Sequence, residues 1–230
     1  MKLQAALDFD YRSTNRGQAE ELSIFWTELA QALVGEARES LDIIEVGTPF
    51  VMEYGLAPVR KLKQAFPEKL ILADLKIADA GYYEAAAAFK SGADIATVLA
   101  VTDDATILNA MTAAKEYGRS IMVDMLAVPD LPTRLMQIDA LGVDYICLHT
   151  SKDLQRLDQD MSKSFEVLRS YVKNAKLAIA GGINRTTIEK FAAICPDVII
   201  VGEGITGAAD YGEAAAFFKA AMDAVERGER

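Results

Sequence analysis

The chain has 230 residues, of which 51% are hydrophobic and 25% charged, enough for the core and surface of one large domain. Its formal net charge of -10 argues against a nucleic-acid partner, because an acidic body repels phosphate backbones. No apolar run approaches the roughly 20 residues of a membrane-spanning helix, and the N-terminus lacks the features of a signal peptide. We therefore expect a cytoplasmic protein with no membrane partner. The two cysteines, Cys147 and Cys195, lack C-x-x-C spacing and are interpreted as small buried hydrophobes.

Eight short runs rich in valine and isoleucine recur along the chain, and each is continuous rather than alternating. Such runs are typical of parallel strands that are buried on both faces. They predict strands at Leu3–Asp8, Ile43–Gly47, Leu70–Leu75, Ile95–Leu99, Ser120–Met125, Tyr145–His149, Lys176–Ala180 and Val198–Val201.

Stretches with a hydrophobic period near 3.6 alternate with these strands and predict helices. They lie within Gly17–Ala37 and at Val59–Phe66, Tyr82–Lys90, Ala105–Tyr117, Leu131–Leu141, Phe165–Val172, Thr186–Ile194 and Tyr211–Arg227. The runs Gly92-Ala93-Asp94 and Gly142-Val143-Asp144 fit the end of a helix followed by entry into a strand.

Eight strand-then-helix units in a chain of this length predict an α/β fold, a (β/α)8 TIM barrel of parallel strands. No linker or change of composition divides the chain, so we expect a single domain over residues 1–230. A doubly wound sheet would need a glycine-rich fingerprint after the first strand, and Asp8-Phe9-Asp10-Tyr11 stands there instead.

Charged side chains gather at the carboxyl ends of the predicted strands, where TIM barrels carry their reacting groups. They are Asp8, Glu45, Asp74, Lys76, Asp79, Asp124 and His149. So many carboxylates raise one another's pKa unless a cation compensates them, and Mg²⁺ prefers a few carboxylates completed by water and substrate oxygens. We predict Glu45 and Asp74, on adjacent strands, as magnesium ligands. Lys76 is expected to neutralise Asp8 or Asp79.

Structural interpretations compete with the catalytic ones. A carboxylate at a strand end is more often a helix N-cap than a catalyst, and Asp79 and Asp104 are open to that interpretation. Glu45 and Asp124 lie inside apolar strands, where a buried charge is costly, which favours a function for both. His149 is the only histidine; its place at a strand end favours proton transfer over a position in the core.

Glycines follow the last two predicted strands, as Gly181-Gly182 and as Gly202-Glu203-Gly204. In many barrels the loop amides and a short helix N-terminus at this place bind phosphate without a cationic side chain. Tight turns also use glycine pairs. Their occurrence after both strands favours a phosphate site, and hence a phosphorylated small molecule as the partner.

Several of these segments resemble the orotidine monophosphate decarboxylase superfamily, and the resemblance extends over nearly the whole chain. The segments are Leu3–Asp8, Glu45–Pro49, Ala73–Gly81 and Ala180–Ile183. Within the superfamily they are similar to the group that contains 3-hexulose-6-phosphate synthase and 3-keto-L-gulonate-6-phosphate decarboxylase. The D-x-K-x-x-D run from Asp74 to Asp79 is the most specific mark.

The resemblance implies a magnesium-dependent aldol reaction that joins formaldehyde to D-ribulose 5-phosphate through an enediolate. It places Mg²⁺ on Glu45 and Asp74, and the proton transfer on His149. Asp8, Lys76 and Asp79 would surround the enediolate, with Asp79 reaching across a homodimer interface. Gly182, Gly202 and the amide of Glu203 would hold the phosphate.

Two alternatives remain open at this point. The decarboxylases usually carry glutamate at the position of Asp124 and arginine at the position of Lys152. Synthases often have an uncharged residue at this second position, so Lys152 is intermediate and does not decide between the two activities. A non-catalytic barrel that binds a sugar phosphate is the alternative of another class.

Two departures from the family pattern also bear on function. The segment from Asp10 to Leu41 is longer than usual and brings Arg12 and Arg16 close to the rim, either as a gating loop or as a longer outer helix. Glu203 places a carboxylate beside the expected phosphate. Either its side chain turns to solvent while its amide binds, or the distal group of the substrate is not a phosphate.

Overall fold

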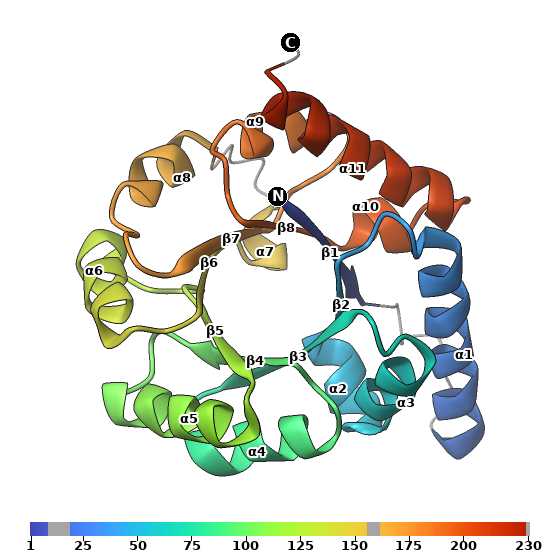
Figure 1. The fold of residues 1–230 in the computed structure, drawn as a ribbon, viewed down its shortest axis with the longest axis horizontal. Coiled ribbons are helices and arrows are strands. Elements are labelled where there is room, and N and C mark those ends of the chain that lie inside the picture. The colour runs from blue at the N-terminus through green and yellow to red at the C-terminus, as the bar shows by residue number, and fades with distance from the viewer. Residues whose placement is uncertain (9–18, 156–161, 229–230) are drawn as a thin grey trace.

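Eight parallel strands close a barrel in chain order, with β1 paired to both β2 and β8 (Figure 1). The computed structural model describes residues 1–8, 19–155 and 162–228. The strands are β1 (Lys2–Leu7), β2 (Ile43–Val46), β3 (Leu70–Ile77), β4 (Ile95–Leu99), β5 (Ser120–Asp124), β6 (Tyr145–His149), β7 (Lys176–Ala180) and β8 (Val198–Val201). The predicted (β/α)8 TIM barrel is confirmed.

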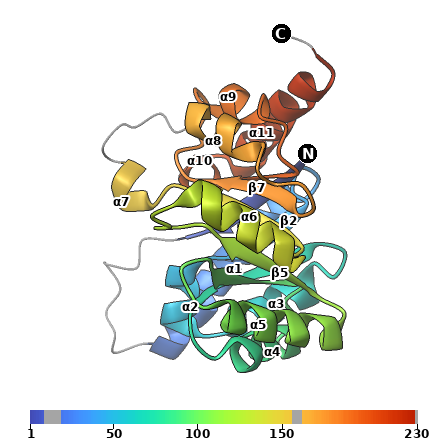
Figure 2. The same ribbon diagram turned by 90° about the vertical axis from the view of Figure 1, so that its left-hand side faces the viewer.

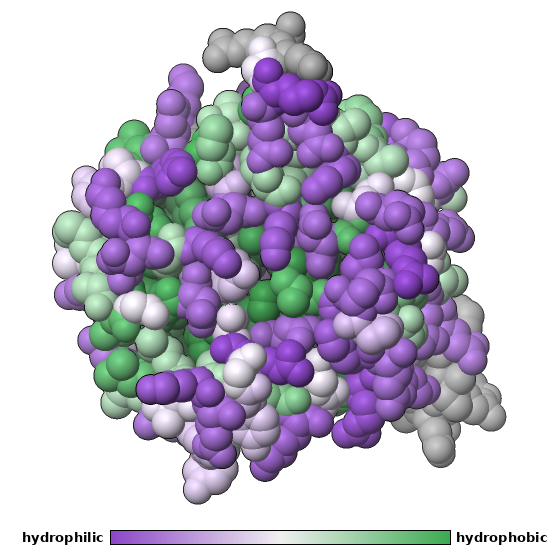
Figure 3. Space-filling model, viewed as in Figure 1, coloured by the Kyte–Doolittle hydropathy of each residue, from purple (hydrophilic) through white to green (hydrophobic). Residues whose placement is uncertain are grey.

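Helices surround the strands as an outer ring, which Figures 1 and 2 show from two directions. They are α1 (Ala19–Ala37), α2 (Thr48–Tyr54), α3 (Ala57–Ala65), α4 (Gly81–Lys90), α5 (Asp104–Tyr117), α6 (Leu131–Leu141), α7 (Lys152–Gln155), α8 (Ser162–Arg169), α9 (Ile188–Ala192), α10 (Glu203–Thr206) and α11 (Tyr211–Glu226). None of the helices in the described ranges is long and apolar enough to cross a bilayer. The face of the molecule seen in Figure 3 carries many hydrophilic side chains, with hydrophobic ones between them.

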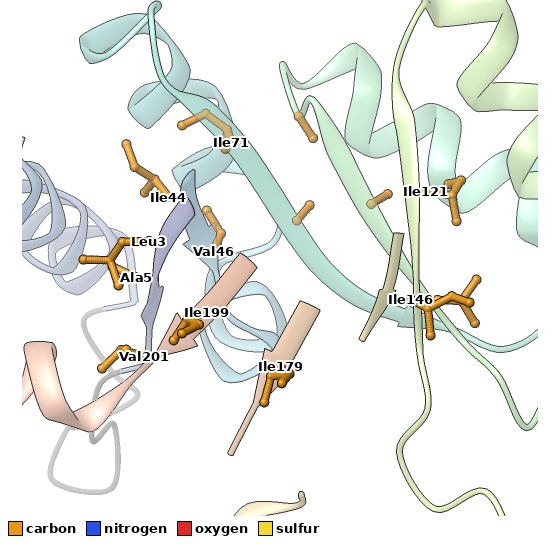
Figure 4. Packing of buried hydrophobic residues seen from close by; sticks show 14 of the residues in the cluster. Leu3, Ala5, Ile44, Val46, Ile71, Ile121, Ile146, Ile179, Ile199 and Val201 are labelled. Atoms are coloured by element: carbon orange, nitrogen blue, oxygen red, sulfur yellow. The ribbon is translucent and has the colours of Figure 1, made fainter. Parts of the chain in front are cut away.

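Successive strand residues alternate between the barrel interior and the layer of helices, as the pleat requires. In β2, Ile43 belongs to the inner apolar cluster and Ile44 to the outer one. Figure 4 shows part of the outer cluster, including Ile44, Ile71 and Ile199. Burial of one such side chain is worth about 1.5–3 kcal/mol. This outer layer therefore stabilises the barrel. Inward positions at the carboxyl ends of the strands can then carry polar groups without removing that stabilisation.

An aspartate precedes each even-numbered strand and accepts a backbone N–H from the preceding odd-numbered strand. The four bonds run from Leu3 N to Asp42 Oδ2 (2.9 Å), Ile71 N to Asp94 Oδ2 (2.9 Å), Ile121 N to Asp144 Oδ2 (2.9 Å) and Leu177 N to Asp197 Oδ2 (2.8 Å). They satisfy amide groups where the strands begin. This device therefore ties the strands in pairs at the end of the barrel opposite the candidate site.

The structure differs from the sequence prediction in its short elements. Helices α2, α7 and α10 were not predicted, because segments of four to seven residues are too short to show a helical period. The prediction that both cysteines are buried is right for Cys147 and wrong for Cys195, which is exposed in a left-handed conformation with φ 53°. Arg12 and Arg16 lie outside the described residues.

Candidate active site

Most of the predicted site residues converge on the carboxyl-terminal mouth of the barrel. Glu45, Asp74 and Asp124 occupy inward positions of β2, β3 and β5, and their exposed fractions are only 7%, 7% and 3%. Asp8 directly follows β1, and His149 ends β6. Each lies an even number of residues beyond an inward apolar position of its own strand, so the period of two carries all of them inward.

Lys76 bridges two carboxylates of different strands. Its Nζ lies 2.7 Å from Asp74 Oδ2 and 3.2 Å from Asp124 Oδ2. The expected ion pair with Asp8 or Asp79 is therefore corrected to Asp74 and Asp124. Burial alone would lower the pKa of Lys76, but the two carboxylates reverse this and raise it above its ordinary value. The side chain thus acts as a fixed ammonium cation and not as a base.

The backbone of Lys76 has a left-handed conformation, with φ 48°. Such a conformation costs a residue other than glycine about 1–3 kcal/mol and tends to occur at functional sites. It coincides with a register shift, since Ala73 pairs with Ala96 but Ile77 pairs with Val98. The predicted strand end at Leu75 is accordingly too early, because the chain resumes strand pairing beyond the bulge.

Two threonine hydroxyls orient the carboxylate of Asp74. Thr48 Oγ1 donates to Oδ2 at 2.7 Å, and Thr97 Oγ1 donates to Oδ1 at 2.7 Å. The sequence alone did not single out these two residues, because a threonine at a helix start or inside a strand has no distinctive pattern. A signal existed for Thr97, which lies two residues after the inward Ile95 and therefore on the inner face of β4.

Asp124 and His149 form a second pair, with Asp124 Oδ2 2.9 Å from His149 Nδ1. Burial raises the pKa of Asp124, but the hydrogen bond and charge of His149, with the charge of Lys76, outweigh it and leave this pKa below its ordinary value. An ionised Asp124 accepts a hydrogen from Nδ1. The remaining nitrogen, Nε2, then holds the lone pair and can take up a proton.

Asp8, Glu45 and Asp74 make an acidic cluster on the other side of the mouth. Burial first, and then the charges of Asp74 and Asp8, raise the pKa of Glu45 well above its ordinary value. Burial and the charge of Asp74 likewise raise the pKa of Asp8. Gln4 Nε2 donates to Glu45 Oε2.

The donor set of this cluster suits a hard divalent cation. Asp8 Oδ1 and Gln4 Oε1 are buried and accept no hydrogen bond within the part of the chain that the structure describes. Carboxylate and amide oxygens are the ligands that Mg²⁺ prefers, and it commonly keeps several water or substrate oxygens. The described ranges hold no cage of three or more acidic, histidine or cysteine ligands. The predicted ligands Glu45 and Asp74 would have to bind Mg²⁺ beside these two unsatisfied oxygens, with water or substrate oxygens completing its coordination.

Gly47 provides the space in which the Asp8 carboxylate lies. A Cβ atom built on Gly47 would be 1.9 Å from Asp8 Oδ1, far inside van der Waals contact. The φ of Gly47 is -64°, which any residue can adopt, so the requirement for glycine is steric. Gly47 and Asp8 therefore pack as a unit between β1 and β2.

The glycines predicted to hold phosphate lie at the ends of β7 and β8. Gly181 and Gly182 have φ values of 95° and 74°, and Gly202 is the N-cap of α10. A Cβ on Gly204 would lie 2.9 Å from Phe218 Cζ, which gives this glycine a packing role as well. The side chain of Glu203 is exposed, as expected if only its amide faces the site.

Lys152 and Asp79 stand at the margin of the site. Lys152 begins α7, and its positive charge partly offsets the raised pKa of Asp8, which places it near the mouth. Asp79 is exposed in the loop after β3 and is not brought together with the other acids within one chain. Exposed apolar side chains lie on neighbouring elements, with Tyr83 on α4, Val101 before α5 and Leu108 on α5. A groove of about 860 Å³, lined in part by Val101, lies between the loops that follow β4 and β5.

Comparisons with known proteins identify the relatives of this chain. A model of the orotidine 5'-phosphate decarboxylase / HUMPS family matches residues 1–218. The 3-hexulose-6-phosphate synthase of Bacillus subtilis (strain 168) is 46% identical over 95% of this chain and 97% of its own length. That of Staphylococcus haemolyticus is 41% identical over 98% and 99%.

Two solved structures extend the comparison. The 3-hexulose-6-phosphate synthase of Salmonella typhimurium is 35% identical, covers 100% of both chains and has a TM-score of 0.87. The 3-keto-L-gulonate-6-phosphate decarboxylase of Vibrio cholerae is 26% identical over 96% of this chain and 97% of that one, with a TM-score of 0.78. The chain therefore belongs to the orotidine 5'-phosphate decarboxylase / HUMPS family of lyases.

Proposed function

We propose that the chain is a 3-hexulose-6-phosphate synthase, which joins formaldehyde to D-ribulose 5-phosphate and gives D-arabino-hex-3-ulose 6-phosphate. The observation that carries the proposal is the Asp124–His149 pair, held at 2.9 Å beside the Lys76 ammonium. His149 can accept the proton that leaves the sugar, and the Lys76 ammonium can stabilise the negative charge of the enediolate that forms. The names of the relatives that are 46% and 41% identical support the same activity.

In this proposal His149 removes a proton from the substrate and returns the same proton to the product. Nε2 takes the proton from C1 of the sugar phosphate, and the electron pair left behind forms the enediolate. C1 then adds to the carbon of formaldehyde, and the same proton returns to the oxygen of the new hydroxymethyl group. Asp124 holds Nδ1 throughout and stabilises the imidazolium, while Lys76 stabilises negative charge on the substrate.

We propose Mg²⁺ as the cofactor, with Glu45 and Asp74 as its protein ligands. When bound, it would act as a Lewis acid toward the oxygens of the sugar. Thr48 and Thr97 hold Asp74 for this role, and Gln4 holds Glu45. Burial, and after it the charges of Asp74 and Asp8, raise the pKa of Glu45, and a bound dication would offset those two charges.

The phosphate of the substrate is assigned to the glycines after β7 and β8. Amides of Gly182, Gly202 and Glu203 would donate to its oxygens, and Gly181 and Gly204 shape the two turns. Lys152 would add a positive charge at the rim. An acidic protein can bind an anion in this way, because backbone dipoles supply local positive potential without a net charge.

A homodimer is proposed from the surface around Asp79. Its carboxylate is exposed, and the described residues near it include the exposed apolar side chains of Tyr83, Val101 and Leu108. A second copy covering this surface would bury them and bring Asp79 toward the partner's site. We further propose that the protein functions in the cytoplasm.

The test compares two reactions of the same enzyme. Purified protein is incubated with Mg²⁺, D-ribulose 5-phosphate and formaldehyde, and separately with 3-keto-L-gulonate 6-phosphate, and hexulose phosphate and carbon dioxide are measured. We expect aldol turnover to exceed decarboxylation and to fall by about 10²–10⁴ in His149→Asn. Faster carbon dioxide release would favour the decarboxylase. Absence of both activities in a folded protein would favour a non-catalytic barrel.

A further inference from the structure

Strand β3 is irregular where it carries the site residues Asp74 and Lys76, and a single residue of β4 lies opposite this irregular segment. Ala73 pairs with Ala96 and Ile77 with Val98, so residues 74–76 oppose Thr97 alone. The extra residues and the left-handed backbone of Lys76 leave the regular ladder broken at this point. Both Asp74 and Lys76 are thereby directed to the mouth of the barrel.

The side chain of Thr97 connects the two ends of this irregular segment. Its hydroxyl accepts the backbone N–H of Lys76 at 2.9 Å and donates to Asp74 Oδ1 at 2.7 Å. Thr97 is 4% exposed, so water does not compete for these bonds. Threonine is branched at Cβ and restricted in χ1, which fixes the direction of the hydroxyl.

We infer that Thr97 is a positioning residue of the active site, which holds the Asp74 carboxylate and the Lys76 backbone in their working geometry through one hydroxyl. The inference rests on the proposed function. Thr97 touches neither substrate nor metal in this assignment. It acts through Asp74, whose other oxygen is shared by Thr48 and Lys76.

The test uses an isosteric variant with a conservative rescue. Thr97→Val keeps the shape but removes the hydroxyl, whereas Thr97→Ser keeps the hydroxyl. We expect Thr97→Val to lower kcat and weaken Mg²⁺ binding, measured by calorimetric titration, by about 10–100-fold each. KM for the sugar phosphate should change less than kcat, and Thr97→Ser should restore most of both losses.

Asp139→Asn is the control for loss of stability without loss of positioning. Asp139 is 4% exposed and accepts backbone N–H groups from Lys173, Asn174 and Ala175, in the loop that enters β7 at the far end of the barrel. It should lower the melting temperature and leave kcat and Mg²⁺ affinity unchanged. If Thr97→Val folds poorly, Thr97→Cys replaces it, because a thiol is only a weak donor.

Each outcome separates this inference from the proposed function. Thr97→Val with wild-type kcat and Mg²⁺ affinity, or Thr97→Ser as impaired as Thr97→Val, would overturn the positioning role. If the wild-type protein lacks aldol activity, the proposed function fails. The Mg²⁺ titrations of the two variants would still decide whether the Thr97 hydroxyl positions Asp74.

Discussion

Lys76 reaches from β3 across β4 to Asp124 on β5, so that one ammonium group neutralises a carboxylate of its own strand and one two strands away. This links the acidic cluster of Asp8, Glu45 and Asp74 to the proton-transfer pair of Asp124 and His149. The two halves of the site are therefore electrostatically coupled through Lys76.

Replacing Lys76 by methionine tests this coupling. We expect Lys76→Met to lower kcat by about 10³-fold, because the charge on the substrate and on two carboxylates loses its partner. Lys63→Met is a matched control: the Lys63 side chain is 23% exposed against 22% for Lys76 and pairs with Asp94 at the far end of the barrel. It should cost stability but not kcat. Equal kcat losses in both variants would argue against a specific role.

Gly47→Ala should disrupt the position of Asp8. The new methyl group would overlap Asp8 Oδ1, so the carboxylate must move, and we expect a loss of stability of about 1–3 kcal/mol together with lower activity. Gly35→Ala in α1 is the control, since nothing lies within 4 Å of its added Cβ. That change should stabilise the protein by about 0.5–1 kcal/mol. Equal melting temperatures for the two variants would contradict the steric argument.

Glu45→Gln should change the pH dependence of stability without metal. The pKa of Glu45 is higher in the folded protein than its ordinary value of 4.5, so ionisation of this carboxyl group at higher pH destabilises the folded state. The folded state thus binds the proton more tightly, and this contribution to stability is lost as pH rises. The variant should therefore be more stable than the wild type at pH 8, and this advantage should shrink toward pH 4.5. Chelator-treated samples melted at several pH values would show it; a pH-independent difference would refute the assignment.

The aspartates at the amino ends of the even strands should contribute unequally. Asp94 is buried and also pairs with Lys63 and Arg119, so Asp94→Asn should cost about 2 kcal/mol. Asp144 makes the same backbone bond but is exposed, so Asp144→Asn should cost less than about 1 kcal/mol. Urea unfolding measures both, and kcat should be unchanged in each. A larger loss in Asp144→Asn would contradict the ranking.

Tyr83→Glu should convert the proposed dimer to monomers. Tyr83 is 78% exposed on α4, and a charge buried there would be costly. Val167→Glu is the control, because Val167 is 63% exposed on α8, which lies across the barrel from α4 (Figure 1). Sedimentation equilibrium should give the monomer mass for the first variant only. Activity should fall together with dimerisation if Asp79 completes the active site of the partner subunit.

Strand positions and the inward polar residues could be predicted from sequence, because buried parallel strands leave continuous apolar runs and charges within them stand out. Glu45 and Asp124 were singled out in this way, and His149 as the only histidine, at the end of a strand. The carboxylates that pair with Lys76 were not predicted correctly, because the bulge in β3 depends on the register of this strand against β4. Thr48 and Thr97 were missed because their roles follow from contacts between strands and helices distant in sequence.

The most direct measurement is the Mg²⁺ dependence of aldol turnover, followed in the same preparation as Mg²⁺ binding. After treatment with excess chelator, the protein should lose turnover with formaldehyde and D-ribulose 5-phosphate, and added Mg²⁺ should restore it at one site per chain. Glu45→Gln and Asp74→Asn should each weaken that binding. A protein that binds no Mg²⁺ and keeps full turnover in chelator would contradict the account.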